Sequence, residues 1–297
     1  MSRAMVRVVK IALSRMKGSS VLIVDSQVHI WGADTAERPW PRRAEPQRPV
    51  PLGKDELLRE MDAAGVDRVV IVPPSWEGDR NDLATEAHLA HPERFATMGR
   101  LDPLDPASTR AIAHWRAQPG MLGLRFTFHI PQLVTLITEG HMDWVWGEAE
   151  KAGVPVYVLI PHPLVYLIDE IAGRHPRLRL VMDHLGLNSK QRDADAFAEF
   201  DKLLSIAKRP NVAAKVSALP CYSTDRYPYR SLHGYIQQAY DAFRPQRLFW
   251  GSDLSRSPIP YRQHVTMFTE EMPWLTEGDK EWIMGRGVCE WIGWQIP

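Results

Sequence analysis

Apolar and polar positions follow two periods along the chain, and from Val21 onward segments of the two kinds alternate. Short apolar runs typical of buried strands occur repeatedly. They lie at residues 21–30, 66–75, 95–102, 122–129, 154–162, 178–186, 211–219 and 247–256. Runs such as "VVIV" (69–72) and "VYVLI" (156–160) have no polar face, which predicts strands that are covered on both sides and therefore parallel.

Helical patterns with recognisable ends lie between these strands. Their termini are marked by Asn81 and Asp105 as N-caps, by Pro106 at a first helical position, and by Gly65, Pro92, Gly153 and Pro176 at carboxyl ends. Strand–helix units repeated over about 230 residues predict an α/β fold, a (β/α)₈ TIM barrel in a single domain. A doubly wound open sheet is the alternative, but no Gly-rich phosphate loop follows the first strand.

Two segments do not fit the alternation. Residues 1–20 carry lysines and arginines but no acid, and they lack the unbroken apolar stretch of a signal peptide. We expect a basic N-terminal extension there, with the barrel at 21–297. Residues 32–53 form a Pro-rich loop that is too long for a plain connector. It is either an extended surface loop or a lid over the barrel mouth.

Composition excludes several classes of function. The chain of 297 residues has 36 Lys plus Arg and 36 Asp plus Glu, so no net charge favours nucleic acid or an anionic membrane. No apolar run approaches the length of a membrane span. Two cysteines, Cys221 and Cys289, are typical of a reducing compartment, which predicts a cytoplasmic protein. We expect a small-molecule substrate, no nucleic-acid or membrane partner, and leave open a homo-oligomer.

Polar side chains stand at the carboxyl ends of most predicted strands. In a barrel of this class the catalytic residues lie at that end. The candidates in chain order are Gln27, His29, Arg125, His129, His162, Asp183, His184, Lys215, Asp253 and Arg256. Taken singly, each has an ordinary explanation, such as a hydrogen-bonded core histidine or a helix cap. Together they predict a site, because such groups are not buried side by side without pairing, a metal or a substrate.

The first strand, "VDSQVHIW" (24–31), carries three of its polar residues in alternation. Asp25, Gln27 and His29 are expected to share one face, because side chains in a strand alternate with a period of two. Polar groups on a buried strand are costly unless they have partners or a function. We therefore expect this strand to deliver its polar face to the site.

These residue types permit two chemistries. In the first, histidine and aspartate hold a divalent metal such as Zn²⁺, which lowers the pKa of a bound water, and Asp253 takes the proton. In the second there is no metal. Asp253 is then the general base, the histidines polarise the scissile carbonyl, and Arg125 and Lys215 hold an anionic group.

Four motifs resemble one known family. "DSQVHIW", "VMDHLG", "NVAAKVSAL" and "LFWGSDLSR" are similar to signatures of the amidohydrolase superfamily, in its amidohydrolase-related branch. That branch includes 2-pyrone-4,6-dicarboxylate lactonase, other lactonases and metal-dependent decarboxylases. The resemblance implies that Asp253 activates water and that His29, His184 and His162 occupy the positions of family histidines. It also implies that Arg125 and Lys215 face the substrate.

Gln27 is a departure from this resemblance. Family members that need a metal usually have histidine there, and an amide oxygen is only a weak ligand for Zn²⁺. The substitution favours a site that requires no cofactor. Zn²⁺ or another divalent metal remains the alternative. Its ligands would then be His29, His162, His184 and Asp253.

The sequence predicts a hydrolase of a small lactone or related ester with acidic or aromatic character. Asp253 would activate water, and His184, His29 and His162 would stabilise the oxyanion. The expected substrate-binding residues are Gln27, Arg125, Lys215, Trp31, Tyr222 and Arg256. One alternative is a metal-dependent amidohydrolase or a non-oxidative decarboxylase of an aromatic acid. A non-catalytic ligand-binding barrel is another.

Overall fold

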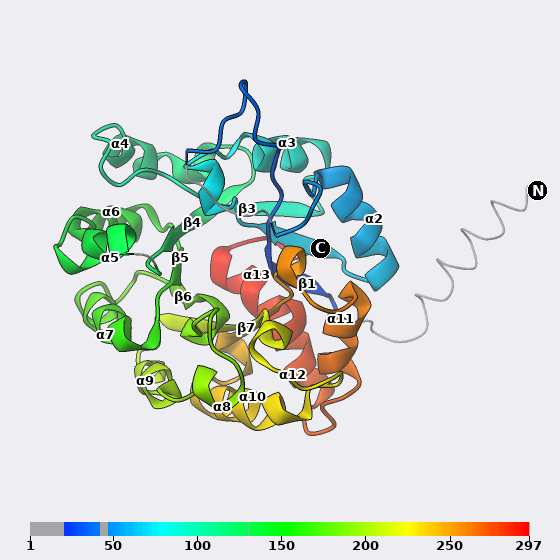
Figure 1. Cartoon of the computed structure of the whole chain (residues 1–297). Coiled ribbons are helices and arrows are strands. Elements are labelled where there is room, and N and C mark those ends of the chain that lie inside the picture. Colours follow the sequence, from blue (N-terminus) through cyan, green and yellow to red (C-terminus); the bar gives the residue numbers. More distant parts are fainter. Residues whose placement is uncertain (1–20, 42–46, 130, 297) are drawn as a thin grey trace, which may run out of the picture.

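Eight parallel strands, ordered β1 to β8, form a nearly closed barrel with helices around it (Figure 1). The computed structural model describes residues 21–41, 47–129 and 131–296. The strands are β1 (Val24–Val28), β2 (Arg68–Ile71), β3 (Phe95–Gly99), β4 (Met121–Thr127), β5 (Val156–Leu159), β6 (Leu180–Met182), β7 (Val212–Ser217) and β8 (Leu248–Gly251). The predicted (β/α)₈ barrel is confirmed, and each predicted strand exists.

The α-helices alternate with the strands from α2 onward. They are α2 (Lys54–Ala64), α3 (Asp82–Ala90), α4 (Ser108–Ala113), α5 (Pro131–Thr138), α6 (Asp143–Ala152), α7 (Val165–Arg174), α8 (Asp193–Ala196), α9 (Phe200–Ser205), α10 (Arg230–Phe243), α11 (Tyr261–Thr269), α12 (Glu277–Glu281) and α13 (Gly287–Ile292). Gly65 and Gly153 end α2 and α6 in the left-handed conformation, as predicted. Helix α4 begins later than predicted, because Asp105 caps the amide of Ala107 in a preceding turn.

Most of the predicted strands are longer than the strands observed. Short 3₁₀ turns follow β5, β6, β7 and β8 at His162–Leu164, Asp183–Gly186, Leu219–Tyr222 and Leu254–Arg256. In each of these segments the apolar run in the sequence therefore continues beyond the last residue of the observed strand. These turns carry several of the polar residues predicted for the site.

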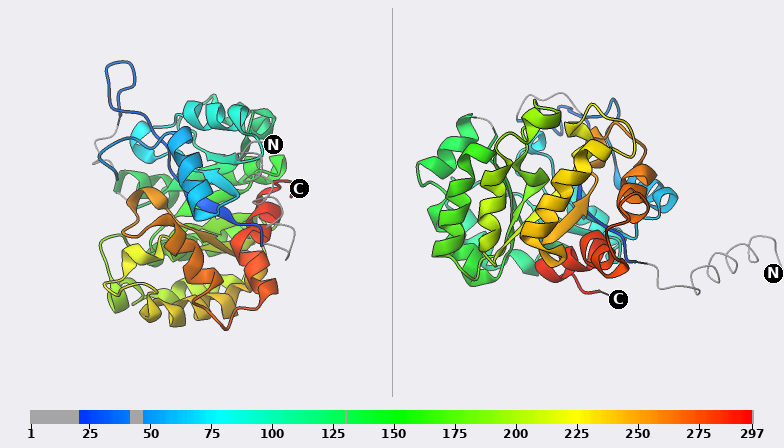
Figure 2. Two further views of the ribbon diagram at one scale, coloured as in Figure 1. Left: turned by 90° about the vertical axis from the view of Figure 1, so that its right-hand side faces the viewer. Right: turned by 90° about the horizontal axis from the view of Figure 1, so that it is seen from below.

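The barrel encloses one hydrophobic core, and a second lies between strands and helices. The inner core contains Val24, Val70, Tyr157 and Phe249 together with residues of the C-terminal helix α13, such as Val288. Helix α13 lies across the end of the barrel opposite the strands' carboxyl ends (Figures 1 and 2). It closes this end, so the other end remains for a site.

The pairing of β1 with β2 contains a bulge that changes the face of Asp25. The register of β1 shifts between Asp25 and Val28. Asp25 accepts hydrogen bonds from the amide of Ser252, at 2.9 Å, and from the hydroxyl of Tyr261 on α11, at 2.8 Å. Asp25 therefore faces the helix layer and does not share a face with Gln27. The prediction that Asp25, Gln27 and His29 share one face of the strand is therefore wrong for Asp25. The bulge interrupts the alternation of side chains between the two faces.

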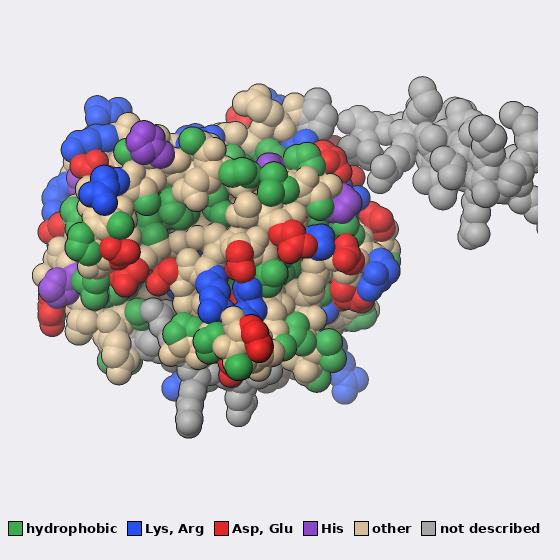
Figure 3. Space-filling model, turned by 90° about the horizontal axis from the view of Figure 1, so that it is seen from above, with side chains coloured by type: hydrophobic (Ala, Val, Ile, Leu, Met, Phe, Trp, Pro, Cys, Tyr) green, Lys and Arg blue, Asp and Glu red, His purple; other side chains and the backbone are tan. Residues whose placement is uncertain are grey.

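The described parts of the Pro-rich loop, 32–41 and 47–53, are fixed to the body of the barrel. The Arg38 side chain donates to Glu77 and Asp82, both at 2.6 Å, while Arg48 donates to Glu60 at 2.6 Å. The basic extension 1–20 lies outside the described residues. On the face that Figure 3 shows, basic and acidic side chains are interspersed. None of the described helices combines the length and apolarity that crossing a membrane requires.

Candidate active site

A cavity of about 570 Å³ opens at the carboxyl ends of the strands. Its lining contains polar residues from several strand ends. These are His29, Gln47, Ser75, Arg125, His129, His184, Asn188, Ser189, Lys190, Tyr222, Asp253 and Arg256, with Trp76, Leu159, Pro161 and Leu187 as apolar neighbours. The volume suits a small molecule. The structure thus brings His29, His184 and Asp253 together with Arg125, Tyr222 and Arg256, as the sequence predicted.

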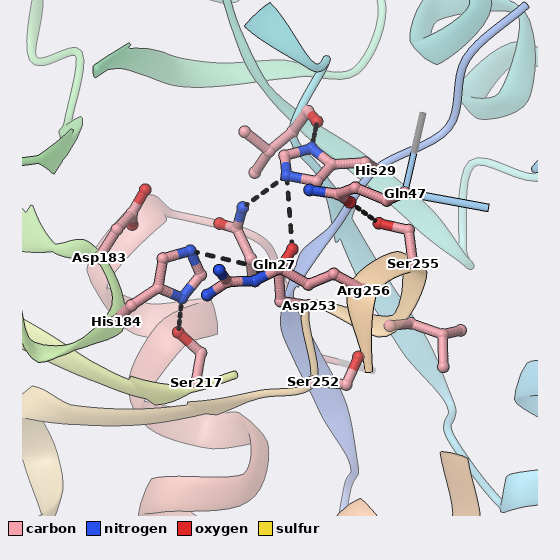
Figure 4. A network of polar contacts seen from close by, with 12 residues as sticks. Gln27, His29, Gln47, Asp183, His184, Ser217, Ser252, Asp253, Ser255 and Arg256 are labelled. Atoms are coloured by element: carbon pink, nitrogen blue, oxygen red, sulfur yellow. Dashed lines mark hydrogen bonds and ion pairs between the residues drawn. The ribbon is translucent and has the colours of Figure 1, made fainter. Parts of the chain in front are cut away.

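Asp253 follows β8 and lies at the centre of the site (Figure 4). Its backbone is left-handed, with φ 52° and ψ 48°, and its amide donates to the Gln27 carbonyl at 2.9 Å. Non-glycine residues rarely adopt this conformation, and those that do cluster at functional sites. Its Oδ1 atom is buried and accepts no hydrogen bond from the described residues. This oxygen is therefore free to accept from a ligand or water.

Arg256 controls the charge of Asp253. Its Nε atom donates to Asp253 Oδ2, and its Nη2 atom donates to the Tyr222 hydroxyl at 2.7 Å. Burial alone would raise the pKa of Asp253, but the Arg256 guanidinium, together with His184 and His29, outweighs this and holds the pKa well below its usual range. Asp253 is consequently a carboxylate at all pH values near neutrality.

His29 lies beside the free oxygen of Asp253. Its Nε2 atom is 3.4 Å from Asp253 Oδ1, and its Nδ1 atom is 2.5 Å from the Val72 carbonyl oxygen. Burial lowers the pKa of His29. The imidazole is therefore neutral at physiological pH, and the carbonyl fixes the proton on Nδ1, because a carbonyl oxygen can only accept.

His184 approaches Asp253 from the turn after β6. Its Nε2 atom is 3.7 Å from Asp253 Oδ2, and its Nδ1 atom is 2.7 Å from the Ser217 hydroxyl. His184 and Leu185 both have positive φ angles, 51° and 52°, and the imidazole points toward Asp253 (Figure 4). Burial lowers the pKa of His184 to about 3, so this ring is neutral too.

Lys215 and Gln27 lie beneath the cavity and not in its lining. Lys215 is 0% exposed, and its Nζ atom is 2.8 Å from both Gln27 Oε1 and Asp183 Oδ1. The same ammonium stands over the Tyr157 ring, 3.4 Å from its centroid. Arg125 reaches the cavity above this layer, with its Nε atom 3.1 Å from Asp183 Oδ2. Two of the predicted substrate-binding residues thus contact other protein groups.

His162 and Trp31 also lie away from the cavity lining. The Nε2 atom of His162 is 2.8 Å from the Leu185 carbonyl oxygen, and its ring faces Phe200 of α9. His162 is thus not brought together with the other two histidines. Trp31 is buried and packs edge-on against Trp76, which itself lines the cavity.

Sequence reasoning missed both Gln47 and Lys190. Gln47 comes from the Pro-rich loop and accepts a hydrogen bond from the Ser255 hydroxyl next to Arg256 (Figure 4). Lys190 and its neighbours come from the loop after β6. Loop residues of this kind carry no local signal, because their place at the cavity depends on how the loop folds back. The Pro-rich composition of residues 32–53 was the only indication in the sequence that this loop reaches the cavity.

The side chains do not fit a divalent metal in this arrangement. Among the described residues no group of three or more His, Cys, Asp or Glu could hold a metal ion. The neighbouring charges give a physical reason, since the Arg256 guanidinium already pairs with Asp253 and the Lys215 ammonium occupies the Gln27 oxygen. Both positive charges would repel a divalent cation at this position.

Curated relatives of this chain are lactonases. The L-fucono-1,5-lactonase of Burkholderia ambifaria is 24% identical over 77% of this chain and 79% of its own length. The enzyme of the same name from Burkholderia multivorans is 27% identical over 78% of this chain and 81% of its own length.

Three solved structures illustrate how widely this fold is shared. An amidohydrolase from Burkholderia multivorans with bound zinc has a TM-score of 0.77 at 20% identity, over 92% of this chain and 99% of that one. A probable 2-pyrone-4,6-dicarboxylic acid hydrolase from Acinetobacter baumannii, with citric acid bound, has a TM-score of 0.70 at 17% identity, over 92% and 100%. A 5-carboxyvanillate decarboxylase from Novosphingobium aromaticivorans, with manganese, has a TM-score of 0.60 at 15% identity, over 80% and 79%.

The amidohydrolase family model matches residues 24–286. This range begins at the first residue of β1 and ends at Arg286, just before α13, so it includes all eight strands and the turns that carry His184 and Asp253. The resemblance of the four motifs is thereby confirmed. The chain belongs to the amidohydrolase family.

Proposed function

We propose that this protein hydrolyses a small lactone or related ester with acidic or aromatic character. The observation that carries the proposal is the free Oδ1 atom of Asp253, a buried carboxylate oxygen at the floor of the cavity beside two neutral imidazoles. A carboxylate in this position can take a proton from a water molecule as that water attacks a carbonyl carbon.

The reaction needs one water molecule and one shuttled proton. Asp253 accepts the proton while the water oxygen bonds to the lactone carbonyl carbon. The tetrahedral intermediate then collapses, the ring carbon–oxygen bond breaks, and Asp253 returns the proton to the leaving oxygen. The product is the open-chain hydroxy acid, which releases one proton to solvent at neutral pH.

His184 is the histidine suited to stabilise the oxyanion. Its Nδ1 atom can accept from the Ser217 hydroxyl, which leaves the proton on Nε2. The charge of Asp253 favours this tautomer, because Nε2 faces that carboxylate at 3.7 Å. His29 is not suited to this role, since its Nε2 atom has no proton to donate. We therefore assign oxyanion stabilisation to His184 and not to all three predicted histidines.

The lining of the cavity suits an anionic ring. The terminal nitrogens of Arg125 make no hydrogen bond within the described residues, and Lys190 adds a further cation at the mouth. A guanidinium binds a carboxylate through two parallel hydrogen bonds. Trp76 and Tyr222 provide apolar surface for a flat substrate.

The relatives support the same reaction class. Two are named as lactonases, and one structural neighbour is named as a hydrolase of a pyrone dicarboxylic acid. The zinc and manganese in two neighbours make a divalent metal plausible in this fold. We propose that this chain requires none, since Arg256 and Lys215 already supply positive charge there. The two unpaired cysteines support a cytoplasmic location.

A panel of lactones tests the proposal. The protein, treated with chelator and then dialysed, is assayed in a pH-stat against sugar lactones, pyrone carboxylates and phenyl esters, with and without added Zn²⁺. We expect proton release from a carboxylated lactone at the same rate in both conditions. Activity that returns only with Zn²⁺ would support the metal hydrolase, and carbon dioxide release from aromatic acids would support the decarboxylase. Binding without turnover of any compound would overturn the proposal.

A further inference from the structure

A chain of buried hydrogen bonds connects Lys215 to His29 through Gln27. The Nζ atom of Lys215 is 2.8 Å from Gln27 Oε1. Gln27 Nε2 is in turn 3.4 Å from His29 Nε2 (Figure 4). Lys215 and Gln27 are fully buried and do not line the cavity. Any effect they have on substrate must therefore pass through His29 or another residue of the lining.

The donors and acceptors in this chain can be assigned from chemistry alone. An ammonium group only donates, so the atom of Gln27 that faces Lys215 must be the carbonyl oxygen. The amide nitrogen of Gln27 therefore faces His29. An amide nitrogen also only donates, so His29 Nε2 must accept the hydrogen bond and carry no proton.

A separate contact gives the same assignment for His29. Its Nδ1 atom is 2.5 Å from the carbonyl oxygen of Val72, which can only accept. The proton is therefore on Nδ1, and Nε2 presents a lone pair. Val72 lies just beyond β2, whereas Gln27 lies on β1, so two elements independently fix the same tautomer.

The result is a pair of acceptors that face each other across a short gap. His29 Nε2 is 3.4 Å from Asp253 Oδ1, and neither atom carries a proton. Asp253 Oδ1 has no donor among the described residues, and His29 Nε2 receives only the long 3.4 Å contact from Gln27, so its lone pair can be shared with a second donor. A water molecule offers two O–H groups, one for each atom. We propose that Lys215 and Gln27 are positioning residues that act in series to keep His29 Nε2 an acceptor, so that His29 and Asp253 orient the attacking water through both of its hydrogens.

A glutamine on the first strand is suited to this positioning role. A neutral histidine at position 27 could also accept at one ring nitrogen and donate from the other, but its two tautomers exchange these roles and protonation makes both nitrogens donors. In a glutamine the oxygen only accepts and the nitrogen only donates, so the roles are fixed once the oxygen faces Lys215. Glutamine does both as a neutral group. The role of the water rests on the proposed function, but the state of His29 does not.

The direct test is ¹⁵N NMR of wild-type protein with labelled histidine, in the absence of substrate. His29 is assigned by comparison with the His29→Asn variant. At pH 7 we expect His29 to carry its proton on Nδ1, with Nε2 at the chemical shift of an unprotonated acceptor nitrogen. A proton on Nε2 in the wild type would overturn the proposal, whatever the outcome of any activity assay.

The kinetic test is Gln27→Glu, which keeps the size of the side chain and the oxygen that faces Lys215. It replaces the amide donor with an oxygen acceptor, so His29 Nε2 should become protonated and point a donor at Asp253. We expect kcat to fall by at least about tenfold with KM changed by less than about threefold. Gln237→Glu, on the exposed side of α10, is the matched control and should leave both constants unchanged.

Lys215→Met removes the cation and provides a second variant. It frees the Gln27 amide to rotate, so the His29 tautomer should no longer be unique and kcat should fall in the same way. Unchanged kcat in folded Gln27→Glu protein would contradict the positioning role. If the wild-type tautomer is as expected and no ester or lactone is hydrolysed, the proposed function fails while the assignment of His29 remains.

Discussion

Lys215 is a buried cation, and we expect the activity of the site to require its protonated form. Burial lowers the pKa of its ammonium to about 8. The protonated form pairs with Asp183 and holds Gln27, so activity is present below this pKa and is lost as the pH rises through it. We predict that kcat/KM falls above about pH 8, measured against a blank without enzyme because lactones open spontaneously in alkali. Lys215→Arg should remove this fall, and a flat wild-type profile to pH 10 would contradict the prediction.

We expect Arg125 to bind an anionic group of the substrate. Arg125→Met removes the guanidinium that lines the cavity but leaves Asp183 paired with Lys215. We predict that KM for a carboxylated lactone rises by about 10- to 100-fold, in line with the loss of about 1.5–3 kcal/mol for a charged hydrogen bond. KM for a neutral sugar lactone should change by less than about threefold. An equal rise for both substrates would contradict the assignment. Arg59→Met, at an exposed position, is the control.

The residues that sequence reasoning placed best are those that directly follow strands. Asp253 and His184 lie in turns immediately after β8 and β6, so the strand ends fixed their position. Lys215 is two residues before the end of β7, which puts it about 7 Å deeper in the barrel. The alternation of polar and apolar residues in the sequence does not show how deep in the barrel a side chain lies. His162 could not be placed either, because the turn after Pro161 directs its ring toward α9.

At the scale of elements, Arg38 fixes the first described part of the Pro-rich loop, residues 32–41. Arg38 joins the loop to Glu77 and to Asp82 at the start of α3, and Glu77 also accepts from the Gly32 amide. We predict that Arg38→Met speeds hydrogen exchange of the Gly32 amide by about tenfold, since a paired arginine contributes about 1–2 kcal/mol.

The Arg38 variant should have little effect on the rest of the barrel. Exchange of strand amides in β4 and β5 provides the internal reference, because these strands lie away from the loop (Figure 1). If hydrogen exchange accelerated equally in the loop and in the strands, the substitution would have destabilised the whole protein and not only the loop. No change at Gly32 would contradict the role of Arg38.

The strands and helices could be predicted because their periods differ, but the bulge in β1 could not. A bulge adds one residue without changing composition, so "VDSQVHIW" reads as a regular strand. The structure separates its polar residues into three functions. Asp25 closes the junction with β8, Gln27 holds His29 in one tautomer, and His29 lines the cavity.

At the scale of the whole molecule, the C-terminal segment closes the barrel. Gly285, in the π-helical turn before α13, lies so close to β1 that a Cβ atom there would overlap the carbonyl oxygen of Leu22. We predict that Gly285→Ala lowers the free energy of unfolding by about 1–3 kcal/mol, as overpacking does. Denaturant titration followed by circular dichroism measures this.

A second glycine provides the matched control for the whole-molecule prediction. Gly234 lies inside α10, with no atom near the place of a Cβ. Gly234→Ala should therefore stabilise the protein by about 0.5–1 kcal/mol through helix propensity. Destabilisation of similar size at both positions would contradict the view that Gly285 is a packing contact.

The barrel as a whole was predictable because each strand–helix unit repeats the same pattern. The closure of the barrel by α13 was harder to predict, because the sequence does not show that the side chains of this helix point into the barrel. Only the folded structure shows that the loop residues Gln47 and Lys190 line the cavity. The sequence therefore predicts the scaffold and the residues at strand ends better than the specificity.

The central claim is that Asp253 activates water for hydrolysis. The most direct measurement is kcat of Asp253→Asn on the best carboxylated lactone, with chelator present and the spontaneous rate subtracted. Asparagine keeps the shape of the side chain but cannot accept the proton. We predict that kcat falls by about 10²–10⁴-fold while substrate binding, measured by calorimetry, persists. A variant that retains the wild-type kcat would contradict the account.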